Sequence, residues 1–173
     1  MAASVSRSVY DVVRTKRDTR QFDGRPLPEG LVRRIAQAGR MAGSAKNGQP
    51  VRLVLLRDPE NKAKLAACGS YTSILPAAPL VIAIAIAPTG SDIGELFDAG
   101  RAAQNMMVVA WAEGVSSCPN TLQQSEEAAR LLGFPEGYRV PMALIFGYPQ
   151  AGAQHGGRPR LPFEEYVFEE RYR

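Results

Sequence analysis

Apolar residues recur at helical spacing in several segments of the chain. Between Pro28 and Gly43 they lie three or four positions apart, which places their side chains on one face of an α-helix. Proline at the start and glycine after the end are typical helix boundaries. Shorter helices are expected from Ser6 or Ser8 through Val13, over Asn61–Ala67, and over Ser125–Leu132 with Ser125 as the N-cap.

Three segments have the residue pattern of β-strands. Val51–Leu56 interrupts an apolar run with Arg52, which predicts a strand with one face partly in water. Pro79–Ala87 and Val140–Tyr148 are apolar on both faces, which is typical of strands buried at the centre of a sheet. Residues 114–121 are consistent with a further strand that leads into a loop.

The segment Ile93–Glu113 differs from the other predicted helices, because apolar residues surround almost its whole circumference. Such a helix is expected in the core. A chain of 173 residues has few strands with which to cover it, so we expect part of this helix to contact a second copy of the chain. The alternative is a helix buried entirely by its own chain.

The elements alternate along the chain, and helices rather than hairpins separate the strands. This order predicts an α/β or α+β protein in three layers, with a mixed or partly parallel central sheet flanked by helices. The length of 173 residues is close to the ~150 residues of a typical domain. We therefore expect a single domain over residues 1–173.

Composition limits the possible functions. Lys and Arg outnumber Asp and Glu by 21 to 17, for a net charge of +4, which favours an anionic partner. Cys68 and Cys118 lack the spacing of a zinc site or a disulfide framework. This favours a protein with reduced cysteines in the cytoplasm. No apolar run reaches the ~18 residues that a membrane span needs. The single histidine, His155, does not by itself make a metal site or a catalytic triad.

Four loop segments carry polar groups suited to a ligand. Lys16–Phe22 is a basic cluster whose arginine and lysine side chains suit a phosphate. Ser44–Pro50 is a polar turn that can present hydrogen-bond donors. Residues 114–121 follow the apolar helix, and Arg158–Arg160 places two guanidinium groups on one side of an extended segment. Taken alone, the first of these segments is better explained as a solvated, basic helix end and the second as an ordinary helix-to-strand connection.

The order of these segments resembles the FMN-dependent nitroreductase family. Members of that family open with Arg-Arg-Ser-x-Arg-x-Phe, carry Ser-x-x-Asn-x-Gln-Pro-Trp after the second helix and close with Lys/Arg-x-Arg-x-Pro. The matching segments here are Lys16–Phe22, Ser44–Pro50 and Arg158–Pro162. Further similarity is found in Asp98–Asn105, Gly114–Pro119 and Phe146–Pro149. The resemblance therefore spans nearly the whole chain.

The resemblance implies an FMN site assembled from these segments. The residues implied along the phosphate, the ribityl chain and the pyrimidine edge of the flavin are Lys16, Arg17, Asp18, Arg20, Arg158 and Arg160. Those implied over one face of the isoalloxazine ring are Pro119, Asn120 and Thr121. Those implied to reach the FMN of a partner subunit are Ser44, Asn47 and Gln49.

The same resemblance implies a nitroreductase-like fold and a homodimer, with FMN sites at the subunit interface and exchanged C-terminal arms. It also implies an NAD(P)H oxidoreductase with ping-pong kinetics. A hydride would pass from NADH or NADPH to flavin N5, and electrons would then pass to a nitroaromatic, a quinone or another small acceptor. Hydride transfer depends on stacking and orientation, so we expect no catalytic side chain and no metal.

Departures from the family pattern leave alternatives open. Asp18 stands where many members have serine, and a carboxylate repels a phosphate unless a cation, here Arg17 or Arg158, pairs with it. A flavin-fragmenting branch of the family, the dimethylbenzimidazole synthases, tends to carry aspartate at that position. Val51 replaces a usual tryptophan, Thr121 stands where some members have glutamate, and only a short turn lies between Ala87 and Leu96, where longer members insert lid helices.

Two other classes of function follow from these departures and from the charge. One is a protein that binds or delivers flavin without efficient turnover, which the short turn and Asp18 favour. The other is a basic nucleic-acid module. That second class lacks a recognition motif and an aromatic stacking platform between its cations, so we expect neither nucleic acid nor membrane as a partner.

Overall fold

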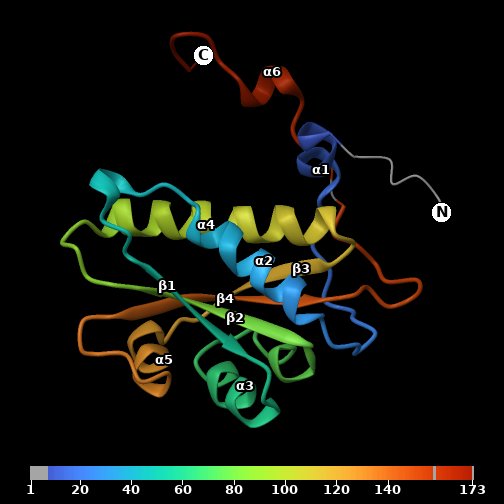
Figure 1. Ribbon diagram of the computed structural model, residues 1–173. Helices are drawn as coiled ribbons and strands as arrows, with labels where there is room; N and C mark the ends of the chain where they lie inside the picture. The colour runs from blue at the N-terminus through green and yellow to red at the C-terminus, as the bar shows by residue number, and fades with distance from the viewer. Residues whose placement is uncertain (1–7, 158, 173) are drawn as a thin grey trace.

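The computed structural model describes residues 8–157 and 159–172 (Figure 1). Its helices are α1 (Val9–Thr15), α2 (Glu29–Arg40), α3 (Pro59–Ala66), α4 (Asp92–Ala112), α5 (Ser125–Leu131) and α6 (Phe163–Tyr166), with 3-10 turns η1 (Ala45–Asn47) and η2 (Leu75–Ala77). Its strands are β1 (Val51–Leu56), β2 (Leu80–Ile86), β3 (Ser116–Thr121) and β4 (Arg139–Gly147). The strands and helices predicted from the sequence are therefore present, and residues 114–121 do contain a strand.

Local hydrogen bonds set the helix boundaries. α1 begins after Ser8, whose side-chain oxygen accepts a hydrogen bond from the Asp11 N–H at 3.1 Å, so Ser8 acts as an N-cap. The alternative cap, Ser6, lies outside the described residues. The prediction of Ser125 as the cap of α5 is wrong, because Ser125 is already the first helical residue and follows Gln124.

The four strands form one sheet in the order β1-β2-β4-β3, and each neighbouring pair is antiparallel. The expected mixed or partly parallel sheet is therefore wrong for these pairs. α4 does return the chain so that β3 runs parallel to β2, as a helical crossover usually does, but β4 lies between the two strands. Across the described ranges, the only parallel pairing is an isolated bridge between Asp18 and Ser117.

Helices cover both faces of the sheet, which confirms the predicted three layers and an α+β fold (Figure 1). On one face, α2 and α4 pack against residues such as Ile82, Ile84 and Phe146. On the other face, α3 and α5 pack against residues such as Val81 and Ile145. Every residue of β2 is buried, as expected for a strand that is apolar on both faces.

α4 is buried along one side and exposed near its N-terminus. Ala99, Ala103 and Met106 belong to the core between α4 and the sheet, whereas Ile93 and Phe97 are 86% and 66% exposed. Burial of α4 by its own chain is therefore incomplete. None of the described helices combines the length and apolar character of a membrane span.

Candidate functional site

The basic cluster of the first motif opens onto a cavity of about 540 Å³. This cavity, called here the basic cavity, lies among α1, α4, β3 and the segment after β4. Its lining residues are Val13, Lys16, Arg17, Asp18, Gln104, Met107, Pro119, Gly156, Gly157 and Arg160. Three cations, one carboxylate and two adjacent glycines thus meet in one place, although they come from two distant parts of the chain.

Backbone hydrogen bonds join the first motif to the Gly-rich segment after β4. The Gly156 N–H donates to the Asp18 carbonyl at 2.8 Å, and the Thr19 hydroxyl donates to the Gln154 carbonyl at 3.0 Å. Thr19 is buried, and its N–H donates to the Ser117 carbonyl at 3.4 Å. These contacts fix the backbone beside the basic cavity, so its charged side chains extend from a rigid frame.

The end of the first motif also lies close to the end of β4, which further fixes the backbone beside the basic cavity. Phe22 forms an isolated antiparallel bridge with Pro149. A Cβ atom at Gly147 would lie 2.7 Å from the Phe22 ring, which is less than a van der Waals contact allows. Glycine at the end of β4 therefore lets the segment after the first motif lie against the sheet.

Lys16 and Arg17, two of the cations in the basic cavity, have different hydrogen-bonding partners. The Lys16 Nζ forms an ion pair with the Asp18 carboxylate and lies 3.6 Å from the Met107 Sδ. The Lys16 side chain is only 10% exposed. Arg17 instead donates to the backbone carbonyls of Arg14 and Lys16, at 2.9 and 2.8 Å. The basic cavity is thus lined by the nearly buried ammonium group of Lys16 and by the guanidinium group of Arg17, which is bound to backbone carbonyls.

The three predicted ring contacts on β3 are not equivalent. Pro119 lines the basic cavity. The buried Asn120 donates to the Cys118 carbonyl at 3.1 Å, and Thr121 is exposed at the strand end; neither lines that cavity. Burial raises the pKa of the Cys118 thiol, against the opposing charge of Arg20, so the thiol stays protonated at neutral pH.

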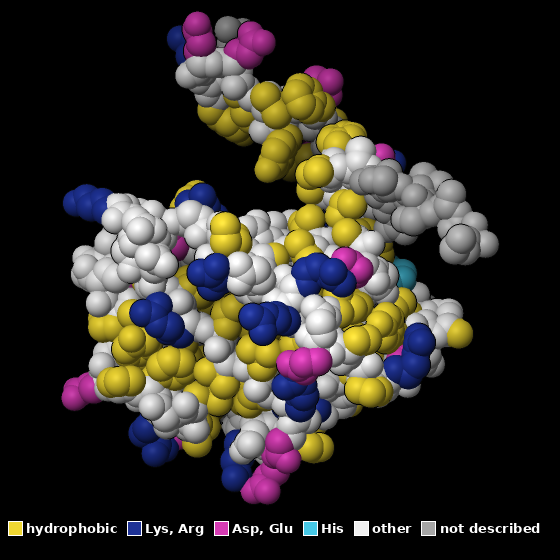
Figure 2. Space-filling model, in the orientation of Figure 1, with side chains coloured by type: hydrophobic (Ala, Val, Ile, Leu, Met, Phe, Trp, Pro, Cys, Tyr) yellow, Lys and Arg dark blue, Asp and Glu magenta, His cyan; other side chains and the backbone are white. Residues whose placement is uncertain are grey.

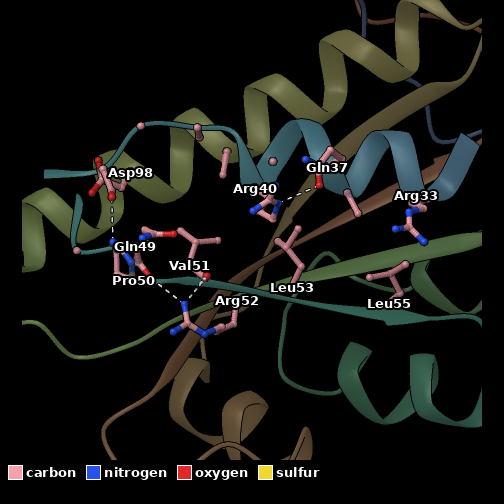
Figure 3. A pocket seen from close by; sticks show the side chains of 17 residues that line it. Arg33, Gln37, Arg40, Gln49, Pro50, Val51, Arg52, Leu53, Leu55 and Asp98 are labelled. Carbon is pink, nitrogen blue, oxygen red and sulfur yellow. Dashed lines mark hydrogen bonds between the residues drawn. The ribbon is translucent and has the colours of Figure 1, made fainter.

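A second cavity of about 680 Å³ lies between α2, β1 and the turn that precedes β1 (Figure 3). We call it the α2–β1 groove. Ser44, Gly48 and Gln49 line it together with Asp98 of α4, and Asn47 belongs to the same turn. Apolar side chains such as Leu53 form its floor, and three arginines surround it: Arg33, Arg40 and Arg52.

The turn beside the α2–β1 groove has an unusual backbone. Lys46, Asn47 and Gln49 all have positive φ, at 49°, 55° and 48°, a region that residues other than glycine seldom occupy. The Ala45 N–H donates to the buried Asp98 carboxylate at 3.0 Å, and the Gln49 N–H donates to the Ser44 Oγ at 2.9 Å. These bonds hold the turn in a conformation that would otherwise be unfavourable.

The predicted site residues therefore divide between two places. Lys16, Arg17, Asp18, Pro119 and Arg160 come together in the basic cavity, whereas Ser44 and Gln49 line the α2–β1 groove. Arg20 is exposed and lines neither cavity. Arg158 lies outside the described residues.

Sequence reasoning did not single out five lining residues of the basic cavity, namely Val13, Gln104, Met107, Gly156 and Gly157. A signal for Gln104 was available, because it is one of the few polar residues in the apolar segment that forms α4. The glycines stand next to the Arg158–Arg160 motif. Met107 carried no signal, since an apolar residue in an apolar helix is expected in the core.

Residues 13–68 and 66–148 match the Nitroreductase family. These ranges cover most of the chain, and the chain belongs to that family. Among its relatives is an NADH dehydrogenase of Thermus thermophilus, which is 26% identical over 189 aligned residues that cover 88% of this chain and 91% of the relative.

Solved structures show the same fold. Nitroreductase A from Vibrio parahaemolyticus superposes with a TM-score of 0.86 at 23% identity, over 96% of this chain and 78% of that one. The NADPH:FMN oxidoreductase from Vibrio harveyi, determined with NAD+, superposes with a TM-score of 0.85 at 24% identity, over 95% and 78% of the two chains. The nitroreductase-like fold expected from the motifs is thus confirmed.

Proposed function

We propose that this protein is an FMN-dependent NAD(P)H oxidoreductase that passes electrons to a small-molecule acceptor. As a member of the Nitroreductase family it is an oxidoreductase. The observation that carries the finer proposal is the convergence of Lys16, Arg17 and Arg160 with Pro119 in one cavity. When bound, FMN would supply a ring that accepts a hydride from NADH or NADPH.

The donor set of the basic cavity fits an FMN. A phosphate monoester carries nearly two negative charges, and lysine and arginine side chains are its usual ligands. Gly156 and Gly157 have no side chains to obstruct the approach of a phosphate to the backbone. The volume of about 540 Å³ lies within the range of roughly 300–1,000 Å³ found for cofactor sites. In our proposal, Lys16, Arg17 and Arg160 hold the phosphate end, and Pro119 contacts the ring.

We further propose a homodimer in which each FMN site uses residues of both subunits. Support comes from the division of the predicted ligands, because the basic cavity and the α2–β1 groove share no lining residue. Ser44, Asn47 and Gln49 would then serve the flavin of the partner. The exposed apolar residues Ile93 and Phe97 at the start of α4 suit burial in such an interface.

The exchange of C-terminal arms is also supported by charge and shape. Within the described residues β1 is an edge strand of the sheet, and it pairs only with β2. Figure 2 shows Lys and Arg side chains gathered on the face over α2 and β1. The segment from α6 onward extends away from the body (Figure 1). This segment carries Glu164, Glu165, Glu169 and Glu170 beside exposed Phe163 and Tyr166. An acidic, aromatic segment of a second copy complements the arginines and apolar floor of the groove.

The test of the proposed function begins with the absorption spectrum of the purified protein. We expect a bound flavin, or uptake of one FMN per chain on reconstitution. Anaerobic addition of NADH or NADPH should then bleach the flavin, and an added quinone or nitroaromatic should restore its colour. Failure to bind FMN at micromolar concentrations would rule out the proposal.

A flavin-binding protein without efficient turnover is the second candidate. The observation that favours it is the brief connection between β2 and α4, in which residues 87–91 form no helix that could cover the ring. Stopped-flow measurement separates the candidates: a carrier binds FMN but is bleached no faster by NADH or NADPH than free FMN is. Cysteine usage and composition lead us to propose a single cytoplasmic domain in either case.

A further inference from the structure

Asp18 is the one carboxylate among the lining residues of the basic cavity. It stands among Lys16, Arg17 and Arg160, the residues proposed to hold a phosphate. A carboxylate in such a position repels a dianion at short range, so its presence is not explained by phosphate binding. The effect of Asp18 on phosphate binding depends on which groups its carboxylate contacts and on whether the carboxylate can leave the cavity.

The structure gives Asp18 a specific partner. Its carboxylate forms an ion pair with the Nζ of Lys16, whose side chain is only 10% exposed and lies against Met107. Arg17 is directed to the backbone carbonyls of Arg14 and Lys16. Asp18 therefore neutralises the least exposed cation of the cavity, the one for which pairing matters most.

The backbone of Asp18 is fixed, so the carboxylate remains in the cavity. The Asp18 carbonyl accepts the Gly156 N–H at 2.8 Å, and Asp18 forms a bridge with Ser117 of β3. Its side chain is 42% exposed, which leaves room for rotation toward water but not for departure of the residue. A phosphate that approaches the Lys16 ammonium in this cavity therefore also approaches the carboxylate paired with it.

We propose that Asp18 weakens the preference of the site for FMN over riboflavin by competing with the terminal phosphate for Lys16. This inference rests on the proposed function, because it assumes that the flavin lies in the basic cavity. An FMN phosphate must share Lys16 with Asp18 or displace it, whereas riboflavin lacks the phosphate and leaves the pair intact. Asp18 thus narrows the difference in affinity between FMN and riboflavin.

The test compares FMN and riboflavin binding by the full chain and by Asp18→Asn, using quenching of flavin fluorescence. Replacing a nearby charge of the same sign by a neutral isostere should tighten FMN binding about tenfold in dilute buffer, with the gain reduced at 0.5 M salt. Riboflavin binding should change less than about twofold, because no phosphate is involved. An unchanged or weaker FMN affinity would overturn the inference.

Two controls keep the outcome interpretable. Asp23→Asn removes a carboxylate that pairs with Arg25 outside the cavity, and it should alter neither affinity. If the Asp18→Asn chain does not fold, Asp18→Ser is used with the same expectations. Absence of binding of either flavin by the unmodified chain contradicts the proposed function, whereas FMN binding without a gain in both Asp18 variants contradicts only the role of Asp18.

Thermal unfolding without flavin gives an independent measurement. Removal of the Asp18 charge leaves Lys16 unpaired, so Asp18→Asn should unfold at a lower temperature than the unmodified chain. Addition of inorganic phosphate should raise the Tm of the variant more than that of the unmodified chain, because the anion replaces the lost partner. Equal shifts in the two proteins would count against the competition.

Discussion

Glu95 is the residue whose ionisation is most strongly tied to the fold. It is 3% exposed and accepts hydrogen bonds from the Thr89 hydroxyl at 2.7 Å and from Arg139 at 3.0 Å. The bonds from the Thr89 hydroxyl and N–H, then those from Ser91 and Arg139, lower its pKa from 4.5 to about 2, against the opposing effect of burial. This carboxylate therefore anchors the turn between β2 and α4 to β4.

Replacing Glu95 by glutamine should lower the free energy of unfolding at pH 7 by about 1.5–3 kcal/mol, the range for hydrogen bonds to a charged group. Because the folded pKa is depressed, the stabilisation is complete above pH 4.5 and is lost as the pH falls toward 2. Urea unfolding of both proteins from pH 7 to pH 2.5 tests this, and the two curves should converge at low pH. Asp92→Asn, at an exposed partner of Arg139, should cost less than ~1 kcal/mol.

Arg160 and Arg20 should both contribute to FMN affinity, but they should differ in their effect on riboflavin affinity. Arg160→Ala removes a cation that lines the basic cavity, and it should weaken FMN binding by about 1.5–3 kcal/mol. Arg20→Ala carries the same expectation from its predicted place near the pyrimidine edge. Riboflavin separates the two sites, since only Arg20→Ala should weaken binding of a flavin without phosphate. Unchanged FMN affinity in both variants would contradict the ligand assignment.

Single residues were predictable from the sequence where a motif fixed the chemistry. Lys16, Arg17 and Arg160 were assigned to a phosphate clamp, and they do line one cavity. The expected pairing of Asp18 with Arg17 is wrong, because Asp18 pairs with Lys16 and Arg17 donates to backbone carbonyls; the choice of partner depends on how the backbone turns after α1. The inward orientation of Asn120 was missed as well, since a side chain's direction on β3 depends on the register with β4.

At the scale of elements, the contact between α2 and α4 depends on Gly39. A Cβ atom there would lie 2.9 Å from the Sδ of Met106, which is fully buried, and 3.3 Å from Leu53. Gly39→Ala should therefore lower the free energy of unfolding by about 1–3 kcal/mol, as expected for an overpacked core.

Gly30 provides a matched control on the same helix, because a Cβ atom added there would meet nothing within 4 Å. Gly30→Ala should leave stability unchanged or raise it by up to ~1 kcal/mol, since alanine favours helix over glycine. Thermal unfolding of both variants measures the difference. Equal stabilities of the two would show that α2 and α4 do not approach closely at Gly39.

Element type was easier to predict than element pairing. The apolar run of β2 and the spacing of apolar residues in α2 gave nearly the observed bounds. The sheet order was not predictable, because periodicity describes one segment at a time. A helix between two strands suggests a parallel pair, but α3 and α5 each connect neighbouring antiparallel strands. The position of β4 between β2 and β3 is decided by packing on both faces of the sheet.

At the scale of the whole molecule, the proposed dimer depends on the C-terminal segment. A chain that ends at Pro162 should sediment as a monomer at concentrations where the full chain is a dimer, because the aromatic side chains that would enter the α2–β1 groove are absent. It should also bind FMN more weakly, since the partner's ligands would be lost. A dimer that persists after the deletion would contradict arm exchange.

Charge substitutions test the proposed contact between the C-terminal segment and the α2–β1 groove without deleting any residue. Changing Glu164, Glu165, Glu169 and Glu170 to glutamine should weaken dimerisation and reduce its salt dependence, because these residues are proposed to face arginines. A control changes Glu60 and Glu126, on α3 and α5 of the opposite layer, to glutamine, and its charge is matched by a variant in which only Glu164 and Glu165 are changed. Sedimentation velocity at low and high salt should show an altered dimer constant for the variants of the C-terminal segment alone.

The central place of β4 has a consequence for biosynthesis. β4 is the last strand in the chain, yet it is the neighbour of both β2 and β3. While a ribosome is still making residues 1–138, β1 and β2 can pair, but β3 has no strand beside it and the core on both faces stays open. The sheet therefore cannot close until residues 139–147 have been made. Such dependence on distant segments slows folding and leaves apolar surface for chaperones to shield in the meantime.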